Sequence, residues 1–177
     1  MNPFDDMQLV DGQLRFKGKF TARCLNADGS LAWEEPLEFD NSATNQGLND
    51  ILGVYFASGT ASPNWYFGLV DNAGFTAFAP ADTPSSHAGW AENTAYTQAN
   101  RQQWVPGAVS GQSITNPVVA SFTMNASVTI KGAFVINNNT KGGTTGTLWS
   151  TGAFGSPQAL VSTQLLQLTY TCSAAGS

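Results

Sequence analysis

Hydrophobic and polar residues alternate strictly near the start of the chain. One parity holds Leu14, Phe16, Gly18, Phe20, Ala22 and Cys24, and the other holds Arg15, Lys17, Lys19, Thr21 and Arg23. Successive side chains of a β-strand point to opposite faces, so this pattern predicts a strand with one buried face.

A second alternating run predicts the partner strand of a hairpin. Asn26–Gly29 has the composition of a tight turn. Beyond it, Leu31, Trp33, Leu37 and Phe39 share one face, whereas Glu34, Glu38 and Asp40 share the other. We therefore expect the acids of the second strand to neutralise the basic row of the first.

One segment has helical spacing. Between Thr44 and Phe56, the residues Leu48, Ile51, Leu52 and Tyr55 recur at intervals of three and four, and Thr44 can serve as the N-cap. The sequence predicts a helix over 44–56 whose apolar stripe covers one end of the sheet.

The remaining pattern indicates short strands separated by turns. Strands are expected at 64–70, 118–125, 128–136 and 164–172, with two shorter ones at 75–78 and 94–97. The segments 118–125 and 128–136 are predicted to pair with each other, and 137–146 is predicted to be an exposed contact loop. Eight to nine strands without repeated βα units predict a mainly β fold, an antiparallel β-sandwich of jelly-roll type.

The chain reads as one domain with an N-terminal extension. Residues 13–177 form the expected sandwich domain. Residues 1–12 show no period and read as an arm, whose apolar residues Phe4, Met7 and Leu9 need a surface to rest on. These three are candidate partner-binding residues.

Composition narrows the function. Of 177 residues only 11% are charged, which leaves little material for exposed helices, and the net charge of −5 argues against nucleic-acid binding. No apolar run has membrane-spanning length and the N-terminus lacks the pattern of a secretory signal, so we expect synthesis in a cytoplasm and no membrane partner.

The two cysteines are expected to be free. Cys24 and Cys172 both fall on the apolar parity of their predicted strands, where a thiol behaves as a small buried hydrophobe. A disulfide between them is the alternative, disfavoured in a reducing cytosol.

Candidate chemistry is sparse. His87 is the only histidine, and although Ser85, Ser86 and Asp82 lie near it, no elbow or cleft signal accompanies them. The acids do not form a supported pair, and the calcium-loop and zinc-site spacings are absent from the sequence. We expect no enzyme and no cofactor; the alternative, a hydrolase, depends on His87 and Asp82.

Aromatic residues leave a binding function open. Trp90 and Trp104 lie in loop-like sequence, where a packed core, a protein interface and a carbohydrate platform compete. Together with Lys141 in the loop 137–146, they are candidate partner-binding residues.

Several strings along the chain are distinctive. The first are TNQGLNDIL at 44–52, WYFGLVD at 65–71 and ADTPSSHAGW at 81–90, and they are followed by NRQ at 100–102, AVSGQSI at 108–114, KGAFV at 131–135 and TKGGTTGTLW at 140–149. Together these strings resemble a family of small structural proteins of tailed-phage virions. The resemblance covers most of the chain after residue 40.

This resemblance implies a virion component. Small β proteins of this kind serve as decoration or cement on phage heads, commonly as trimers that bridge capsid subunits. The expected protein is therefore a homotrimer on the outer surface of the head, bound to the major capsid protein, with the arm clamping a neighbouring subunit. The alternative is a tail-fibre or receptor-binding module that recognises a host surface glycan.

Overall fold

The computed structural model describes residues 14–35 and 39–175. Within them lie β1 (Arg15–Leu25), β2 (Leu31–Glu34), β3 (Phe39–Ala43), α1 (Asn45–Phe56), β4 (Trp65–Asp71), β5 (Glu92–Asn93), β6 (Gln102–Trp104), β7 (Ser113–Thr115), β8 (Ala120–Thr123), β9 (Val128–Ile136), β10 (Leu148–Leu160) and β11 (Leu165–Ala175). The fold is mainly β with a single described helix, as predicted.

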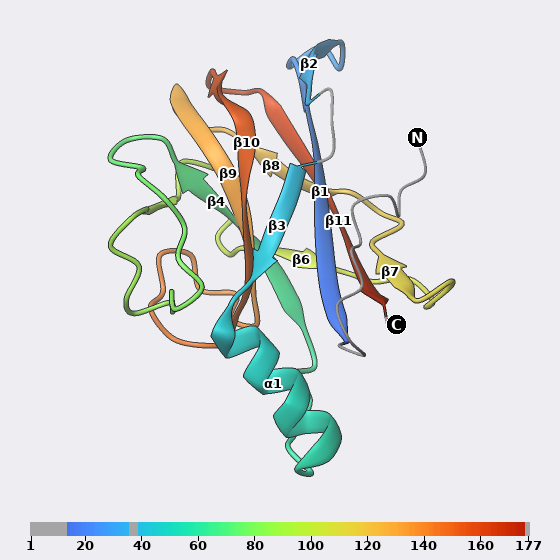
Figure 1. Cartoon of the computed structure of the whole chain (residues 1–177). Helices are drawn as coiled ribbons and strands as arrows, with labels where there is room; N and C mark the ends of the chain where they lie inside the picture. Colours follow the sequence, from blue (N-terminus) through green and yellow to red (C-terminus); the bar gives the residue numbers. More distant parts are fainter. Residues whose placement is uncertain (1–13, 36–38, 176–177) are drawn as a thin grey trace.

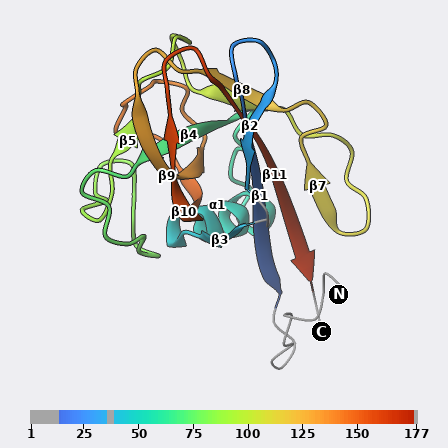
Figure 2. The ribbon, with the colours of Figure 1, turned by 90° about the horizontal axis from the view of Figure 1, so that it is seen from above.

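The strands form one antiparallel sheet that curls so that its two halves face each other. Its order is β5-β4-β9-β10-β3-β1-β11-β7, with β2 beside β1, β6 beside β4 and β8 beside β11. Figures 1 and 2 show β4, β9 and β10 on one side and β1 and β11 on the other. Phe20 of β1 meets Phe67 of β4 across the interior, with ring centroids 6.3 Å apart, so the core lies between two layers as in a β-sandwich.

The N-terminal hairpin is confirmed. The turn closes through a hydrogen bond from the Asn26 amide to the Ser30 carbonyl (2.8 Å), and β2 and β3 both pair antiparallel with β1. The register sets Arg23 opposite Glu34, which supports the expected charge pairing. The predicted contributions of Leu37 and Glu38 lie outside the described residues.

The predicted pairing of 118–125 with 128–136 is wrong, although both segments contain strands. β8 pairs with β11, whereas β9 lies between β4 and β10. Alternation shows that a segment is a strand with one buried face, but it does not specify the neighbouring strand.

Two further corrections concern short segments. Residues 75–78 form a loop whose rings pack together, with the centroids of Phe75 and Phe78 5.1 Å apart, and within 94–97 only Tyr96 makes an isolated bridge. Conversely, the long strand β10 was missed because it contains Gly, Ser and Pro. A register shift between Ala153 and Gln158 accommodates Pro157, as a β-bulge does.

The helix is confirmed, but its predicted packing is mostly wrong. The Thr44 side chain accepts a hydrogen bond from the Gly47 amide (3.0 Å), and the Gln46 side chain accepts one from the Leu148 amide (2.8 Å). These contacts fix the first turn against β10, whereas Leu52 and Tyr55, further along, remain exposed. Figure 1 shows α1 projecting away from the sheet.

Two further expectations concern the cysteines and the membrane. Cys24 and Cys172 are both free thiols, as expected. Burial raises the pKa of each to about 11, so both are neutral near pH 7. The described part of the chain contains no helix with the length and hydrophobicity needed to span a membrane.

Candidate functional site

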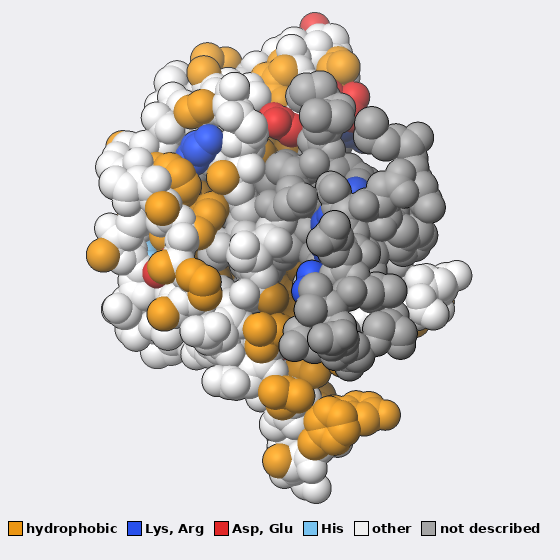
Figure 3. All heavy atoms as spheres, in the orientation of Figure 1, with side chains coloured by type: hydrophobic (Ala, Val, Ile, Leu, Met, Phe, Trp, Pro, Cys, Tyr) orange, Lys and Arg blue, Asp and Glu red, His pale blue; other side chains and the backbone are white. Residues whose placement is uncertain are grey.

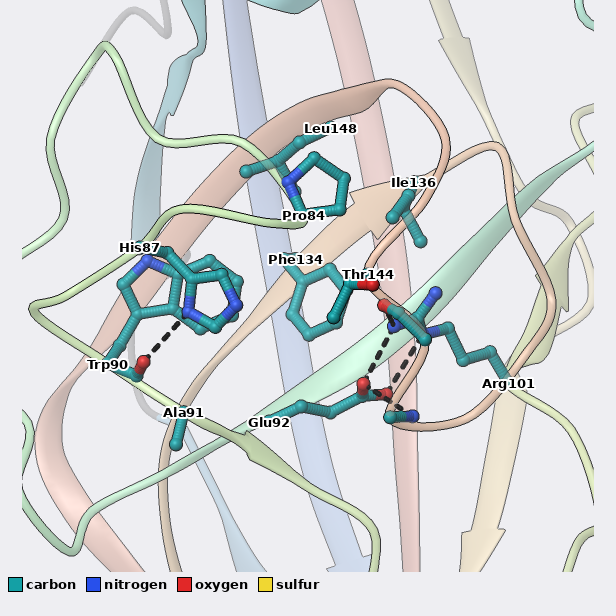
Figure 4. A pocket seen from close by; sticks show the side chains of 12 residues that line it. Pro84, His87, Trp90, Ala91, Glu92, Arg101, Phe134, Ile136, Thr144 and Leu148 are labelled. Atoms are coloured by element: carbon teal, nitrogen blue, oxygen red, sulfur yellow. Dashed lines mark hydrogen bonds and ion pairs between the residues drawn. The ribbon is translucent and has the colours of Figure 1, made fainter.

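A pocket of about 250 Å³ lies where the loops 79–93 and 137–146 come together over β9 (Figure 4). The sequence gives no sign that these two segments are neighbours, and the fold places them side by side. The pocket is lined by Pro84, His87, Trp90, Ala91, Glu92, Arg101, Phe134, Ile136, Gly142, Gly143, Thr144 and Leu148. In Figure 4, His87 and Trp90 stack on one side, and the Arg101–Glu92 ion pair lies on the other.

Arg101 and Glu92 form a buried, bidentate ion pair. Arg101 Nε donates to Glu92 Oε1 at 2.9 Å and Nη2 to Oε2 at 2.7 Å, while the side chains are 2% and 9% exposed. The guanidinium also donates to the carbonyls of Asn138 (2.9 Å) and Gly143 (3.0 Å). The positive charge of Arg101 is thus neutralised, and most of its N–H donors are used inside the chain. The pair therefore holds the loop 137–146 in place and leaves few donors to bind an anion.

The loop 137–146 is largely exposed, as predicted, but specific hydrogen bonds hold it in place. Besides its contacts with Arg101, the loop donates the Gly142 amide to Glu92 (2.8 Å). Lys141 Nζ donates to the carbonyls of Tyr96 and Gln98, each at 2.9 Å, and lies 4.3 Å from the centre of the Tyr96 ring. The lysine ammonium is therefore bound by its own domain.

Trp90 belongs to a small second core. It is 6% exposed, its ring centroid lies 5.2 Å from that of Phe134, and its Nε1 donates to Asp82 Oδ2 at 2.9 Å. His87 stacks on Trp90, with centroids 4.1 Å apart, and its Nδ1 lies 2.8 Å from the Trp90 carbonyl. The indole face is covered, so it does not form an open platform for a sugar.

These contacts bear on the hydrolase alternative. Asp82 is occupied by the Trp90 indole and by the Ala79 amide (2.9 Å), so it does not orient the His87 imidazole as a triad acid would. Within residues 14–35 and 39–175, no cluster of three or more His, Cys, Asp or Glu side chains could hold a metal ion.

Trp104 lies in a different, apolar pocket of about 150 Å³. Its lining consists of Ile51, Trp65, Trp104, Ile114, Trp149 and Cys172. Trp104 is 8% exposed and its Nε1 donates to the Tyr170 carbonyl at 3.1 Å, whereas Trp149 Nε1 donates to the Tyr170 hydroxyl at 2.8 Å. These two indole N–H groups are thus satisfied inside the protein, and apolar ring surface faces the pocket.

Among the described residues, the two most exposed large apolar side chains lie on α1. Tyr55 and Phe56 are 80% and 74% exposed, Leu52 is 53% exposed and Leu48 is 37% exposed. We call these four residues the α1 patch. Figure 3 shows hydrophobic side chains gathered on the projecting helix. Exposed apolar residues that gather in this way typically mark an interaction site.

The structure describes three of the six predicted site residues, and they lie at two different pockets. Trp90 and Lys141 lie at or beside the first pocket, and Trp104 lies in the second. Phe4, Met7 and Leu9 lie outside the described residues. The sequence does not reveal the α1 patch, because apolar residues at helical spacing usually indicate a buried face. It does not reveal the Arg101–Glu92 pair either, because neither residue lies in a motif.

A comparison with protein-family models finds no match for this chain, and a comparison with curated proteins finds none either.

Proposed function

We propose that this chain is a non-enzymatic structural protein of a tailed-phage virion, which binds the assembled head lattice as a decoration, or cement, protein. The α1 patch carries this proposal. A helix held by its first turn and by Ile51, with large apolar side chains directed outward, is suited to insertion against another protein surface.

The other features fit an assembly role. The buried Arg101–Glu92 pair and the Lys141 contacts hold the loops at 79–93 and 137–146 in place. Rigid loops lose little conformational entropy on binding, so a preorganised domain attaches more tightly for the same contacts. The resemblance of residues 44–52 and 65–71 to phage structural proteins includes most of α1 itself.

The proposed mechanism is mass action. A protein that binds the assembled lattice, and not the free subunits, stabilises the lattice by its binding free energy. In a homotrimer three α1 patches engage together, so weak individual contacts give tight attachment through effective concentration. The proposed partner is the major capsid protein at the outer surface of the head.

Cryo-electron microscopy of the intact virion tests the location. Density for this fold at threefold or quasi-threefold positions of the head, with α1 directed at the capsid, is the expected result. Density confined to the tail would refute the decoration function and favour the receptor-binding alternative, for which Trp90 and Trp104 do not provide open stacking faces.

A binding assay tests the contact surface. Purified full-length protein is added to virions assembled without it, and attachment is followed by co-sedimentation. The double variant Leu52→Ser/Tyr55→Ser should weaken attachment at least about tenfold, since truncating a central anchor typically costs more than about 1 kcal/mol. The matched control, Val161→Ser, removes a 54% exposed apolar side chain from the β10–β11 turn at the other end of β10 and should attach normally. Equal attachment of both variants would refute α1 as the contact.

A further inference from the structure

The pocket between the loops 79–93 and 137–146 favours an uncharged ligand. Arg101 and Glu92 are the only Arg, Lys, Asp or Glu residues among its twelve lining residues, and they neutralise each other. An anion in the pocket would lie near the Glu92 carboxylate and a cation near the Arg101 guanidinium, and burying a charge without its own counter-ion is costly. Most other lining residues are apolar, namely Pro84, Trp90, Phe134, Ile136 and Leu148.

His87 leaves one hydrogen-bond acceptor available in this pocket. Its Nδ1 lies 2.8 Å from the Trp90 carbonyl, and because a carbonyl oxygen only accepts, the proton of the neutral imidazole is on Nδ1. Nε2 therefore has a free lone pair, which none of the hydrogen bonds within residues 14–35 and 39–175 uses. Figure 4 shows Nε2 on the side of the ring that faces Phe134. The pocket thus offers an acceptor to a ligand that carries an N–H or O–H donor.

The size of the pocket suits one ring with a small substituent. Its volume of about 250 Å³ exceeds the roughly 150 Å³ of an apolar cavity that binds benzene. The walls are preformed, because Glu92 binds both Arg101 and the Gly142 amide, so little conformational entropy is lost when a ligand binds. The Trp90 and Phe134 rings in the lining favour an aromatic ligand over an aliphatic one, since aromatic rings attract one another edge to face.

We propose that this pocket binds a neutral aromatic ring that carries one hydrogen-bond donor, which is donated to His87 Nε2. Phenols and indoles have this chemistry, and both are neutral near pH 7. A sugar fits less well, because it has several hydroxyl groups and the lining would leave most of them without partners. This inference does not depend on the virion assignment.

Binding of p-cresol to the full-length protein tests the proposal. A ligand this small should bind with a Kd of about 1 mM, which is within the range of an NMR titration. Nuclear Overhauser effects should connect the ring protons of p-cresol with the methyl groups of Ile136 and Leu148, which line the pocket. Effects confined to Ile51 and Ile114 would place the ligand in the apolar pocket beside α1 and would overturn the proposal, as would the absence of saturable binding.

A matched control ligand tests the hydrogen bond. 4-Methylanisole has the same ring but a methyl ether in place of the hydroxyl, so it leaves the His87 acceptor unpaired and should bind about tenfold more weakly than p-cresol. Equal binding of the two ligands to the parent protein would overturn the proposal, and this comparison does not require any variant to fold.

Variants of His87 separate the hydrogen bond from the size of the ether. His87→Phe keeps a ring beside Trp90 but lacks the acceptor, so p-cresol should lose its advantage over 4-methylanisole. His87→Gln provides a side-chain oxygen as an acceptor and should restore part of that advantage. A tenfold preference for p-cresol that persists in His87→Phe would contradict the assigned contact.

The same ring chemistry occurs in free phenols and in tyrosine side chains of other proteins. N-acetyltyrosine methylamide carries the phenol on a peptide backbone and distinguishes these sources. It should bind about as well as p-cresol, because Ala91 and Thr144 in the lining are exposed and leave an opening for a backbone. Binding of p-cresol without binding of the amide would restrict the site to free small molecules.

Discussion

Arg101→Met should be among the most damaging single substitutions in this protein. The side chain is 2% exposed and makes four hydrogen bonds, two to Glu92 and one each to the carbonyls of Asn138 and Gly143. Methionine fills part of the volume but cannot donate a hydrogen bond. The Glu92 carboxylate would retain the Gly142 amide as its described partner and would be left as a buried charge without a counter-ion.

The expected loss follows from that burial. Removing one partner of a buried ion pair costs about 3–5 kcal/mol, because the other charge remains desolvated. A domain of this kind has a free energy of unfolding of about 5–15 kcal/mol, so the loss is a large fraction of the total. In the double variant Arg101→Met/Glu92→Met no charge is left behind, and the loss should be smaller than in Arg101→Met alone.

Urea unfolding followed by tryptophan fluorescence measures these losses. Arg15→Met is the control, because it removes an exposed arginine at the start of β1 and should change stability by less than about 0.5 kcal/mol. The reasoning is refuted if Arg101→Met costs less than about 1 kcal/mol, or if the losses of the Arg101 and Glu92 single variants simply add in the double variant.

The structure determines the direction of the stability change in three further tests, two of which have a matched control. Gly68→Ala should cost about 1–3 kcal/mol in urea unfolding, because a Cβ would lie 2.0 Å from a phenylalanine ring atom on β9, whereas Gly53→Ala, with open space in α1, should stabilise by about 0.4–1 kcal/mol. Thr44→Ala should cost about 1–2 kcal/mol in the same assay, because it removes the N-cap of α1, whereas Thr60→Ala, at an exposed loop position, should be nearly neutral. The buried Cys24 thiol, with its pKa raised from 9.0 to about 11, contributes stability that is complete below pH 9 and is lost as the pH rises toward 11, since only the unfolded chain then releases the proton. The free energy of unfolding, measured between pH 9 and pH 11, should therefore fall less steeply with pH in Cys24→Ala than in the parent, by up to about 1.4 kcal/mol per pH unit. The same slope in both proteins would contradict the raised pKa of Cys24.

The local elements can be predicted from the sequence alone. Strict alternation from Leu14 to Cys24 predicted β1, and the spacing of Leu48, Ile51 and Leu52 after Thr44 predicted α1, because strand and helix periods differ and caps are local. Low charge and regular turns predicted the mainly β class. The virion assignment and the identity of its partner stay predictions, which the cryo-electron microscopy above would test.

The identity of neighbouring strands and the exposure of particular side chains depend on tertiary packing. β9 pairs with β4 and β10, and not with β8 as predicted. β10 forms despite its Gly and Pro residues, because strand formation depends on the neighbouring strand as well as on the propensity of the segment itself. The α1 patch is exposed because the described contacts of the helix with the sheet come from its first turn and from Ile51. Arg101 and Glu92 pair directly, and both also bind the loop 137–146, to which neither belongs, so no local pattern identifies them. Periodicity predicts that a helix or strand has an apolar face, whereas the packing of distant segments determines whether that face is covered.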